Sequence, residues 1–320
     1  MNTDDEKAQA AQARMPHSFN ILALDGGGVR GILEAIFIER LDTAWPRFLQ
    51  KTDLIAGVST GGLQALSLAA GKSPTEVREM YEAKSKDIFA DSLLDDFRDM
   101  WKIVGADYSN KNLRKILELQ FGDMRLRDLN KRVAIVAFDL DNGSKGKNSL
   151  RTWKPKVFHN FPGEDTDGEE RVVDVALRTT AAPVYFPTYQ GYCDGGVAAN
   201  NPSMVGVAQA LDPRGSKAQL EHLKVLSLGT GQTELYVPGN NHDWGVAQWG
   251  SKLLYLLVDT PHEMPSFQCA MILKKRFHRV NPPLQGSFSL DNWKKIPELT
   301  AIAQAYDLDP TLEWLEEHWD

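Results

Sequence analysis

One serine of this chain has the sequence surroundings of a nucleophile. Ser59 is the middle residue of Gly57–Gly61, which reads GVSTG and follows a short apolar run. This G-x-S-x-G pattern is typical of a nucleophile elbow, a tight turn from strand to helix in which Gly57 and Gly61 relieve the crowding around the serine. The segment predicts acyl transfer to the Ser59 hydroxyl.

A serine hydroxyl is a poor nucleophile at neutral pH and needs a base within hydrogen-bonding distance. Histidine is the usual base, and of the 7 histidines His262 and His278 are the candidates for a Ser-His-Asp esterase that acts on small esters. A carboxylate stands out as well, because Asp194 follows a short predicted strand and precedes Gly195 and Gly196, which allow close backbone approach. Asp-Gly is also common in ordinary turns, so the residues alone leave the base open.

A glycine-rich loop precedes the serine in the chain. The stretch LALDGGGVRG follows an apolar run, and Gly26, Gly28 and Gly31 fit the G-x-G-x-x-G pattern of a dinucleotide site. Backbone N–H groups of such a loop can hold a phosphate or the oxyanion of an acyl-transfer intermediate. A dinucleotide site needs an acidic residue at the end of the second strand, but Asp53 stands at its start and GVSTG follows its end. An oxyanion loop is therefore favoured, and a non-enzymatic nucleotide-binding module is the weaker alternative.

Strand and helix patterns alternate along the chain, which predicts an α/β fold with a largely parallel sheet. Apolar runs at 19–24 and 53–58 predict buried strands, and apolar residues at helical spacing predict a helix over 32–45. Further helices are expected near residues 110–120, 172–180 and 203–211. The sheet is expected to end near residue 235. We therefore expect a disordered lead-in at 1–18, a catalytic domain at 19–235 and a mainly helical extension at 236–320, packed on the same domain.

Composition limits the function classes. The chain has 320 residues, of which 42% are hydrophobic and 25% charged, and a formal net charge of -7, which argues against nucleic-acid binding and against simple electrostatic attraction to anionic lipid. Cys193 and Cys269 have neither disulfide nor metal-ligand spacing, so buried thiols in a reducing compartment are expected. No metal and no cofactor is expected. Nowhere do about 18 uncharged apolar residues run together, so we expect a soluble or peripheral protein.

Five ordered blocks of the sequence resemble the patatin-like phospholipase family. DGGGVRG matches the oxyanion loop of that family, GVSTG matches its nucleophile elbow, and DGG at Asp194 matches its third catalytic block. The segments TTAAPVYFP and LSLGTG are similar to further parts of the family pattern. Together the matches extend from residue 20 to residue 231, in the order that the family has them.

The resemblance implies a Ser59–Asp194 dyad without a catalytic histidine, in a patatin-like three-layer α/β/α fold with a mostly parallel central sheet. It implies hydrolysis of acyl esters in lipids through an acyl-enzyme. The oxyanion would be bound by backbone N–H groups of Gly26, Gly27 and Gly28. Supporting positions are Arg30, Gly57, Gly61, Gly195 and Gly196.

Two charged side chains near the loop have expected roles. Arg30 is expected to organise the oxyanion loop or to meet a lipid phosphate, with an outward position at the start of the helix as the alternative. Asp25 is expected to tie down the loop rather than to do chemistry.

The expected partner is a phospholipid or another acyl-ester lipid, met at a membrane surface that a cytoplasmic protein contacts peripherally. The chain is also similar to bacterial cytoplasmic patatin-like phospholipases that cyclic nucleotide signals activate in anti-phage defence. An activating small molecule such as a cyclic nucleotide is therefore a candidate partner, as is a second copy of the chain in a homo-oligomer. No nucleic-acid partner is expected.

Overall fold

The computed structural model describes residues 18–89, 106–145, 150–233, 263–286 and 288–319, together with 236, 237, 239, 243–245, 248 and 249. Residues 1–17, nearly all of the expected lead-in, lie outside the described residues.

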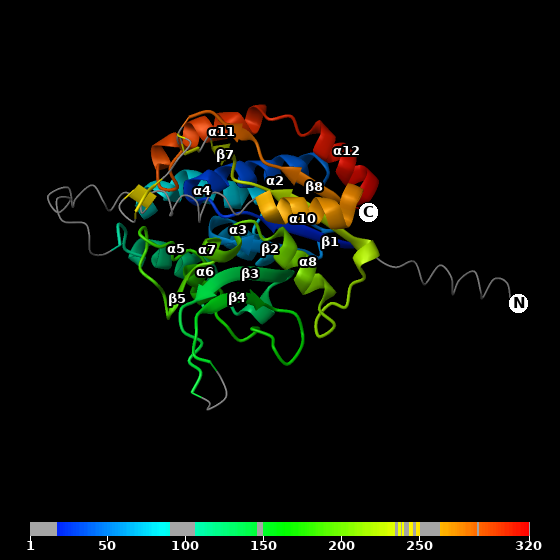
Figure 1. Ribbon diagram of the computed structural model, residues 1–320. Helices are drawn as coiled ribbons and strands as arrows, with labels where there is room; N and C mark the ends of the chain where they lie inside the picture. Colours follow the sequence, from blue (N-terminus) through cyan, green and yellow to red (C-terminus); the bar gives the residue numbers. More distant parts are fainter. Residues whose placement is uncertain are drawn as a thin grey trace, which may run out of the picture.

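Seven strands of the described chain form a mixed sheet at the centre of the fold (Figure 1). They are β1 (Phe19–Leu24), β2 (Leu54–Val58), β3 (Arg132–Asp139), β4 (Lys154–His159), β5 (Tyr192–Asp194), β6 (Leu223–Leu228) and β8 (Phe277–Val280). Their order is β4, β3, β2, β1, β6, β8, and β5 also pairs with β3. β1, β2, β3, β6 and β8 run parallel, whereas β4 and β5 are antiparallel to β3. A separate pair joins β7 (Gln232–Thr233) to β9 (Pro283–Leu284).

Helices cover both faces of the sheet and complete three layers (Figure 1). One face carries α2 (Ile32–Ala44), α3 (Ser59–Ala69), α4 (Pro74–Phe89), α5 (Lys111–Phe121), α6 (Val172–Thr179), α11 (Ile296–Ala305) and α12 (Asp309–His318), and the other carries α8 (Ser203–Leu211) and α10 (Glu263–Leu273). Short helical turns are η1 (Gly28–Gly31), η4 (Leu126–Asp128), α7 (Gly196–Ala199), η5 (Leu220–His222), η7 (Lys274–Arg276) and η8 (Trp293–Lys295).

The central strands are buried on both faces. In β1, Leu22 and Leu24 pack with the first group of helices, and Ile21 and Ala23 pack with α8 and α10. This two-sided burial explains why β1 is a continuous apolar run rather than an alternating one. The three-layer α/β/α fold and the mostly parallel sheet are confirmed, and helices lie where they were expected at 111–121, 172–179 and 203–211.

The expected end of the sheet near residue 235 is wrong. β8 pairs in parallel with β6 and forms one edge of the sheet, so the chain after residue 235 contributes a strand as well as helices. The four residues FHRV of β8 place two polar residues between two apolar ones, so the stretch has neither the alternation nor the apolar run that predicts a strand. Both cysteines are free and buried, as expected.

Strand pairing brings the functional segments to one edge of the sheet. Because parallel strands end on the same side, the residues that follow β1, β2 and β6 lie side by side there, and Leu24 pairs with both Gly57 and Leu228. Val58 of β2 pairs with Val136 of β3. The next residue of β3, Ala137, pairs with Asp194 of the antiparallel β5. Ser59 and Asp194 therefore meet around the end of β3.

None of the described helices is long and apolar enough to cross a membrane. Within the described residues, no group of three or more His, Cys, Asp or Glu side chains has an arrangement that could hold a metal ion.

Candidate active site

The turn between β2 and α3 holds Ser59 in a strained backbone conformation. Its φ is 54°, in the left-handed region that L-residues rarely adopt. Such strain persists only where the surrounding contacts hold it in place. Here the Ser59 N–H donates to Thr179 Oγ1 at 2.8 Å, and Thr179 Oγ1 donates to the Val136 carbonyl at 2.6 Å. The turn has the geometry of a nucleophile elbow.

The two glycines beside Ser59 allow this turn to pack tightly. A Cβ on Gly57 would lie 2.5 Å from the Gly61 carbonyl oxygen, and a Cβ on Gly61 would lie 2.3 Å from the Leu24 carbonyl oxygen. Both positions face backbone atoms, which cannot move aside as a flexible side chain would. The pattern GVSTG is therefore explained by close approach of β1, β2 and α3.

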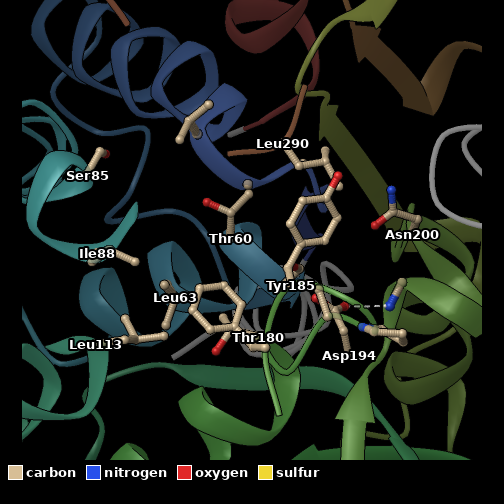
Figure 2. Close-up of a pocket in the computed structure, with 18 of the residues that line it drawn as sticks. Thr60, Leu63, Ser85, Ile88, Leu113, Thr180, Tyr185, Asp194, Asn200 and Leu290 are labelled. Carbon is tan, nitrogen blue, oxygen red and sulfur yellow. Dashed lines mark hydrogen bonds between the residues drawn. The ribbon is translucent and has the colours of Figure 1, made fainter. Parts of the chain in front are cut away.

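The Ser59 hydroxyl lies near enough to the Asp194 carboxyl to lower its pKa. The Asp194 side chain is 4% exposed, and its Oδ1 accepts the Gly196 N–H at 2.7 Å, the bond drawn dashed in Figure 2. Glycine at position 195 lets the turn after Asp194 pack against β3, because a Cβ there would lie 2.4 Å from the Val136 carbonyl oxygen. The structure thus brings together the serine and the aspartate that the sequence singled out.

Burial raises the pKa of Asp194 from 3.8 to about 6. The hydrogen bonds from Ser59 and from the Gly196 N–H act in the opposite direction, since they favour the carboxylate. The result is a carboxylate that is ionised at neutral pH but more basic than an exposed aspartate. Such a group can accept a proton from Ser59 far better than an ordinary aspartate can.

We predict that Asp194→Asn stabilises the fold at neutral pH. A carboxyl whose pKa is raised to about 6 in the folded state destabilises that state once pH exceeds this value, because folding must then bury a charge. Removing the charge should add about 2 kcal/mol above pH 7, and the gain should shrink as pH falls through about 6 towards 4. Thermal unfolding of both proteins across this pH range measures the difference. A lower midpoint for the variant at every pH would contradict the assignment of a buried charge.

Two N–H groups of the glycine-rich loop face the pocket beside Ser59. Gly27 and Gly28 line that pocket, and within the described part of the chain their N–H groups donate no hydrogen bond. Gly28 has a φ of 57°, a left-handed conformation that glycine adopts readily. The Gly26 N–H, in contrast, donates to the Asn200 carbonyl at 3.0 Å. The Gly26 N–H is therefore already used within the protein, which contradicts its expected role as a donor and leaves the N–H groups of Gly27 and Gly28 as the candidates.

Arg30 and Asp25 hold the loop from inside the protein. Arg30 is 0% exposed, so the outward alternative is wrong, and its Nε approaches the Gly27 carbonyl at 3.5 Å. Asp25 is also 0% exposed, and its Oδ2 accepts a hydrogen bond from Arg279 Nη2 at 2.5 Å. Arg30 is absent from the residues that line the described pocket. Both side chains therefore organise the loop.

Ser59 and Asp194 open into a pocket of about 900 Å³, including its mouth (Figure 2). Asp194 lies at one end in Figure 2, and Ile88 and Leu113 of α4 and α5 lie at the other. Most of the lining side chains are apolar. They include Val29, Leu63, Met80, Ile88, Leu113, Pro183, Phe186, Val197 and Leu290.

No described residue that lines this pocket is a histidine. His278 lies on β8, where its Nε2 shares a hydrogen bond with Thr311 Oγ1 at 3.0 Å and its ring stacks on Trp314. His262 lies outside the described residues. The geometry therefore gives Ser59 a carboxylate partner and gives no support to His278 as its base.

Sequence reasoning missed three residues that shape the site. Thr179 holds the elbow, Asn200 accepts the Gly26 N–H through its carbonyl, and the Leu290 carbonyl accepts the Val29 N–H at 2.8 Å. Thr179 belongs to the stretch TTAAPVYFP, which resembles part of the family pattern but indicates no role for a particular residue. No sequence pattern points to Leu290, since it contacts the loop through its backbone carbonyl from a distant part of the chain.

Comparison with known proteins identifies the family of this chain. A family model described as patatin-like phospholipase matches residues 22–206, more than half of the chain. Protein teg of Priestia megaterium is 30% identical over 336 residues, covering 94% of this chain and 99% of that protein. A cGAMP-activated phospholipase of Escherichia coli is 33% identical over 239 residues, covering 66% of this chain and 61% of that protein. The crystal structure of VipD from Legionella pneumophila aligns with a TM-score of 0.45 at 14% identity, over 95% of this chain and 67% of that one.

The matched residues 22–206 contain the glycine-rich loop, the elbow and Asp194 with its two glycines. With the family model covering more than half of its length, this chain belongs to the patatin-like phospholipase family of serine hydrolases.

Proposed function

We propose that this protein cleaves carboxylic esters of phospholipids or related acyl lipids through a Ser59–Asp194 dyad. The observation that carries the proposal is that Ser59 and the buried Asp194 carboxyl lie side by side at the polar end of an apolar pocket, where the Ser59 hydroxyl lowers the pKa of Asp194. Thr179 Oγ1 holds the backbone of Ser59 and the Gly196 N–H holds the Asp194 carboxylate, and neither contact needs a ligand. The reacting groups are therefore positioned in advance.

The reaction proceeds in two steps. Asp194 accepts the Ser59 proton as Ser59 Oγ attacks the ester carbonyl, and the N–H groups of Gly27 and Gly28 bind the oxyanion that forms. Collapse of this intermediate breaks the ester bond, and the leaving alkoxide takes the proton from Asp194. A water molecule then attacks the acyl-enzyme while Asp194 accepts its proton. The second collapse releases the fatty acid and returns that proton to Ser59.

The pocket supports an acyl chain as the part of the substrate that is recognised. An acyl chain with its carbonyl beside Ser59 would extend between α4 and α5, where Leu63, Ile88 and Leu113 offer apolar contacts. Each methylene transferred there from water contributes about 0.8 kcal/mol. A nucleotide phosphate would find little to bind in this lining, which disfavours the nucleotide-binding alternative.

A fluorophosphonate probe and a fluorogenic phospholipid test this proposal together. The wild-type protein should react with the probe at Ser59 and release fatty acid from the phospholipid, and Ser59→Ala should do neither. Ser73→Ala, at the exposed start of α4, is the matched control and should behave as the wild type. Probe labelling without phospholipid hydrolysis would leave the serine hydrolase chemistry in place but contradict the lipid substrate.

The rate of acylation should fall at low pH. Asp194 accepts a proton only as the carboxylate, and its pKa is about 6, so kcat/KM for a soluble chromogenic ester should rise with pH and level off above about 7. Below about pH 5 the slope should approach tenfold per pH unit. Thermal unfolding at each pH separates this titration from loss of the fold. A flat profile between about pH 5 and pH 8 would show that Asp194 is not the base.

We further propose that a cyclic nucleotide regulates the reaction, because relatives at about 30% identity are named cGAMP-activated phospholipases. The described pocket offers no guidance on where such a ligand would bind. Fluorophosphonate labelling of Ser59 with and without cyclic GMP-AMP tests the proposal directly. An unchanged labelling rate at saturating nucleotide would refute this regulation and leave the hydrolase assignment untouched.

A further inference from the structure

A buried ion pair lies directly behind the glycine-rich loop. Arg279 Nη2 donates to Asp25 Oδ2 at 2.5 Å, and Arg279 Nη1 donates to Ser227 Oγ at 2.7 Å. The Asp25 side chain is 0% exposed and that of Arg279 is 15% exposed. Arg279 lies on β8 and Ser227 is its register partner on β6. The guanidinium therefore extends across β6 to reach the end of β1.

Asp25 connects the glycine-rich loop to the nucleophile elbow. It follows β1 and immediately precedes Gly26. Its N–H donates to the Leu228 carbonyl at 3.2 Å and to Glu34 Oε1 at 2.7 Å. Its carbonyl accepts the Gly61 N–H at 3.2 Å, two residues after Ser59. A shift of Asp25 would therefore move the oxyanion loop relative to the nucleophile.

Arg279 is the positive charge next to two buried carboxyl groups, Asp25 and Glu34. Glu34 and Asp25 are both fully buried, and burial together with the charge of Asp25 raises the pKa of Glu34 well above its usual value. Arg279 is the cation that pairs with the Asp25 carboxylate beside Glu34. An unpaired buried carboxylate would be strongly unfavourable, so loss of the guanidinium would drive Asp25 to rotate, take up a proton or admit water.

We propose that Arg279 is a positioning residue for catalysis, which fixes Asp25 and thereby aims the N–H groups of Gly27 and Gly28 at the oxyanion formed at Ser59. This inference rests on the proposed hydrolase function and adds a residue from outside the matched family segment 22–206. It gives the last part of the chain a role in the reaction, because β8 supplies the cation and the Leu290 carbonyl holds the other end of the loop through Val29. Arg279 touches no reacting atom and acts through Asp25.

The test compares Arg279→Met with Arg276→Met, a matched control three positions earlier. Arg276 is also partly buried, and its guanidinium donates to the Leu220 and Leu223 carbonyls at 2.5 and 2.9 Å, at the start of β6. Both variants lose one structural arginine. Arg279→Met should lower kcat for a soluble ester about 10- to 100-fold with KM changed less than about 3-fold, since misplacement of the donors affects the transition state. Arg276→Met should lower the unfolding midpoint and leave kcat near the wild-type value.

Two more variants make the result specific to the ion pair. Arg279→Lys keeps a positive charge that can reach Asp25, so its kcat should be close to that of the wild type. One ammonium group cannot bind Asp25 and Ser227 as the two guanidinium nitrogens do, so a small loss should remain. Asp25→Asn combined with Arg279→Met should be no slower than the slower single variant, because both changes remove the same contact. Equal kcat for Arg279→Met and wild type, or an equal loss in Arg276→Met, would overturn the proposal. If Arg279→Met does not fold, Asp25→Asn, which breaks the same ion pair from its other side, takes its place in the comparison with Arg276→Met.

Hydrogen exchange tests the positioning role of Arg279 independently of the proposed hydrolase function. Amides of residues 25–31 should exchange faster in Arg279→Met than in the wild type, and Arg276→Met should leave them unchanged. A wild-type protein with neither ester hydrolysis nor labelling at Ser59 would refute the hydrolase function, and exchange would then decide the positioning role alone. Unchanged exchange of this segment in Arg279→Met would overturn that role.

Discussion

Ser59→Ala and Asp194→Asn should each remove nearly all turnover while the fold remains intact. Loss of the nucleophile should cost about 10⁴-fold or more in kcat, and loss of the base at least about 10²-fold. The two side chains act as one unit, because the Ser59 hydroxyl interacts directly with the Asp194 carboxyl. Groups that act as one unit have losses that do not add. The double variant should therefore be no slower than Ser59→Ala alone.

Steady-state hydrolysis of a chromogenic ester, with thermal unfolding of each variant, measures this prediction. Asp212→Asn is the matched control, because it makes the same chemical change at a surface carboxylate that pairs with Arg214. It should retain wild-type kcat. A rate above about one tenth of wild type in Asp194→Asn would refute the dyad, since a general base contributes more than that. His278→Ala would then be the next variant to test.

Local sequence signals were sufficient to predict the strand–turn–helix geometry around Ser59. The strand before Ser59, the glycines on both sides of it and the helix after it are all encoded within a short stretch, so the elbow could be predicted without knowledge of distant contacts. Asp194 was harder, because its turn resembles any Asp-Gly turn. Only strand pairing shows why it matters, since β5 returns antiparallel to β3 and places this carboxylate next to the elbow.

The contacts that hold the glycine-rich loop could not be predicted from local signals. Arg279, Leu290 and Asn200 reach the loop from distant parts of the chain, and two of them act through backbone carbonyls that any residue type would provide. The same reason explains the error at Gly26. Three consecutive glycines look equivalent in sequence, but the N–H of Gly26 is paired with Asn200 while Gly27 and Gly28 line the pocket. Long-range pairing decides which of them can donate.

The C-terminal part of the chain is connected to the site by these contacts. Leu290 lines the pocket, its carbonyl accepts the Val29 N–H, and Asp291 accepts a hydrogen bond from the Tyr108 hydroxyl at 2.8 Å. β8 adds Arg279 from the edge of the sheet. Residues after 263 therefore complete the wall around the glycine-rich loop, although no motif in them suggested a functional role.

Gly28→Ala should lower the rate of acylation about 10²-fold or more and leave substrate binding nearly unchanged. Gly28 has a φ of 57°, which is unfavourable for alanine, and a Cβ there would lie 2.1 Å from the Leu290 carbonyl oxygen. The loop must move to relieve this contact, because the obstacle is backbone. Such a movement turns the Gly28 N–H away from the oxyanion, and loss of one donor costs about 3 to 4 kcal/mol in the transition state. The acyl chain binds elsewhere in the pocket, so KM should change little.

Gly122→Ala supplies the matched control for this prediction. Gly122 follows α5 with a φ of 52°, and a Cβ there would meet nothing within 4 Å, so alanine at this position strains the backbone without the contact. Both variants should lose folding stability because alanine rarely adopts a positive φ, and Gly28→Ala has in addition the clash with the Leu290 carbonyl. Only Gly28→Ala should slow the labelling of Ser59 by a fluorophosphonate. If labelling in Gly28→Ala were as fast as in Gly122→Ala, the Gly28 N–H would not be an oxyanion donor, and the glycine-rich loop would need another explanation.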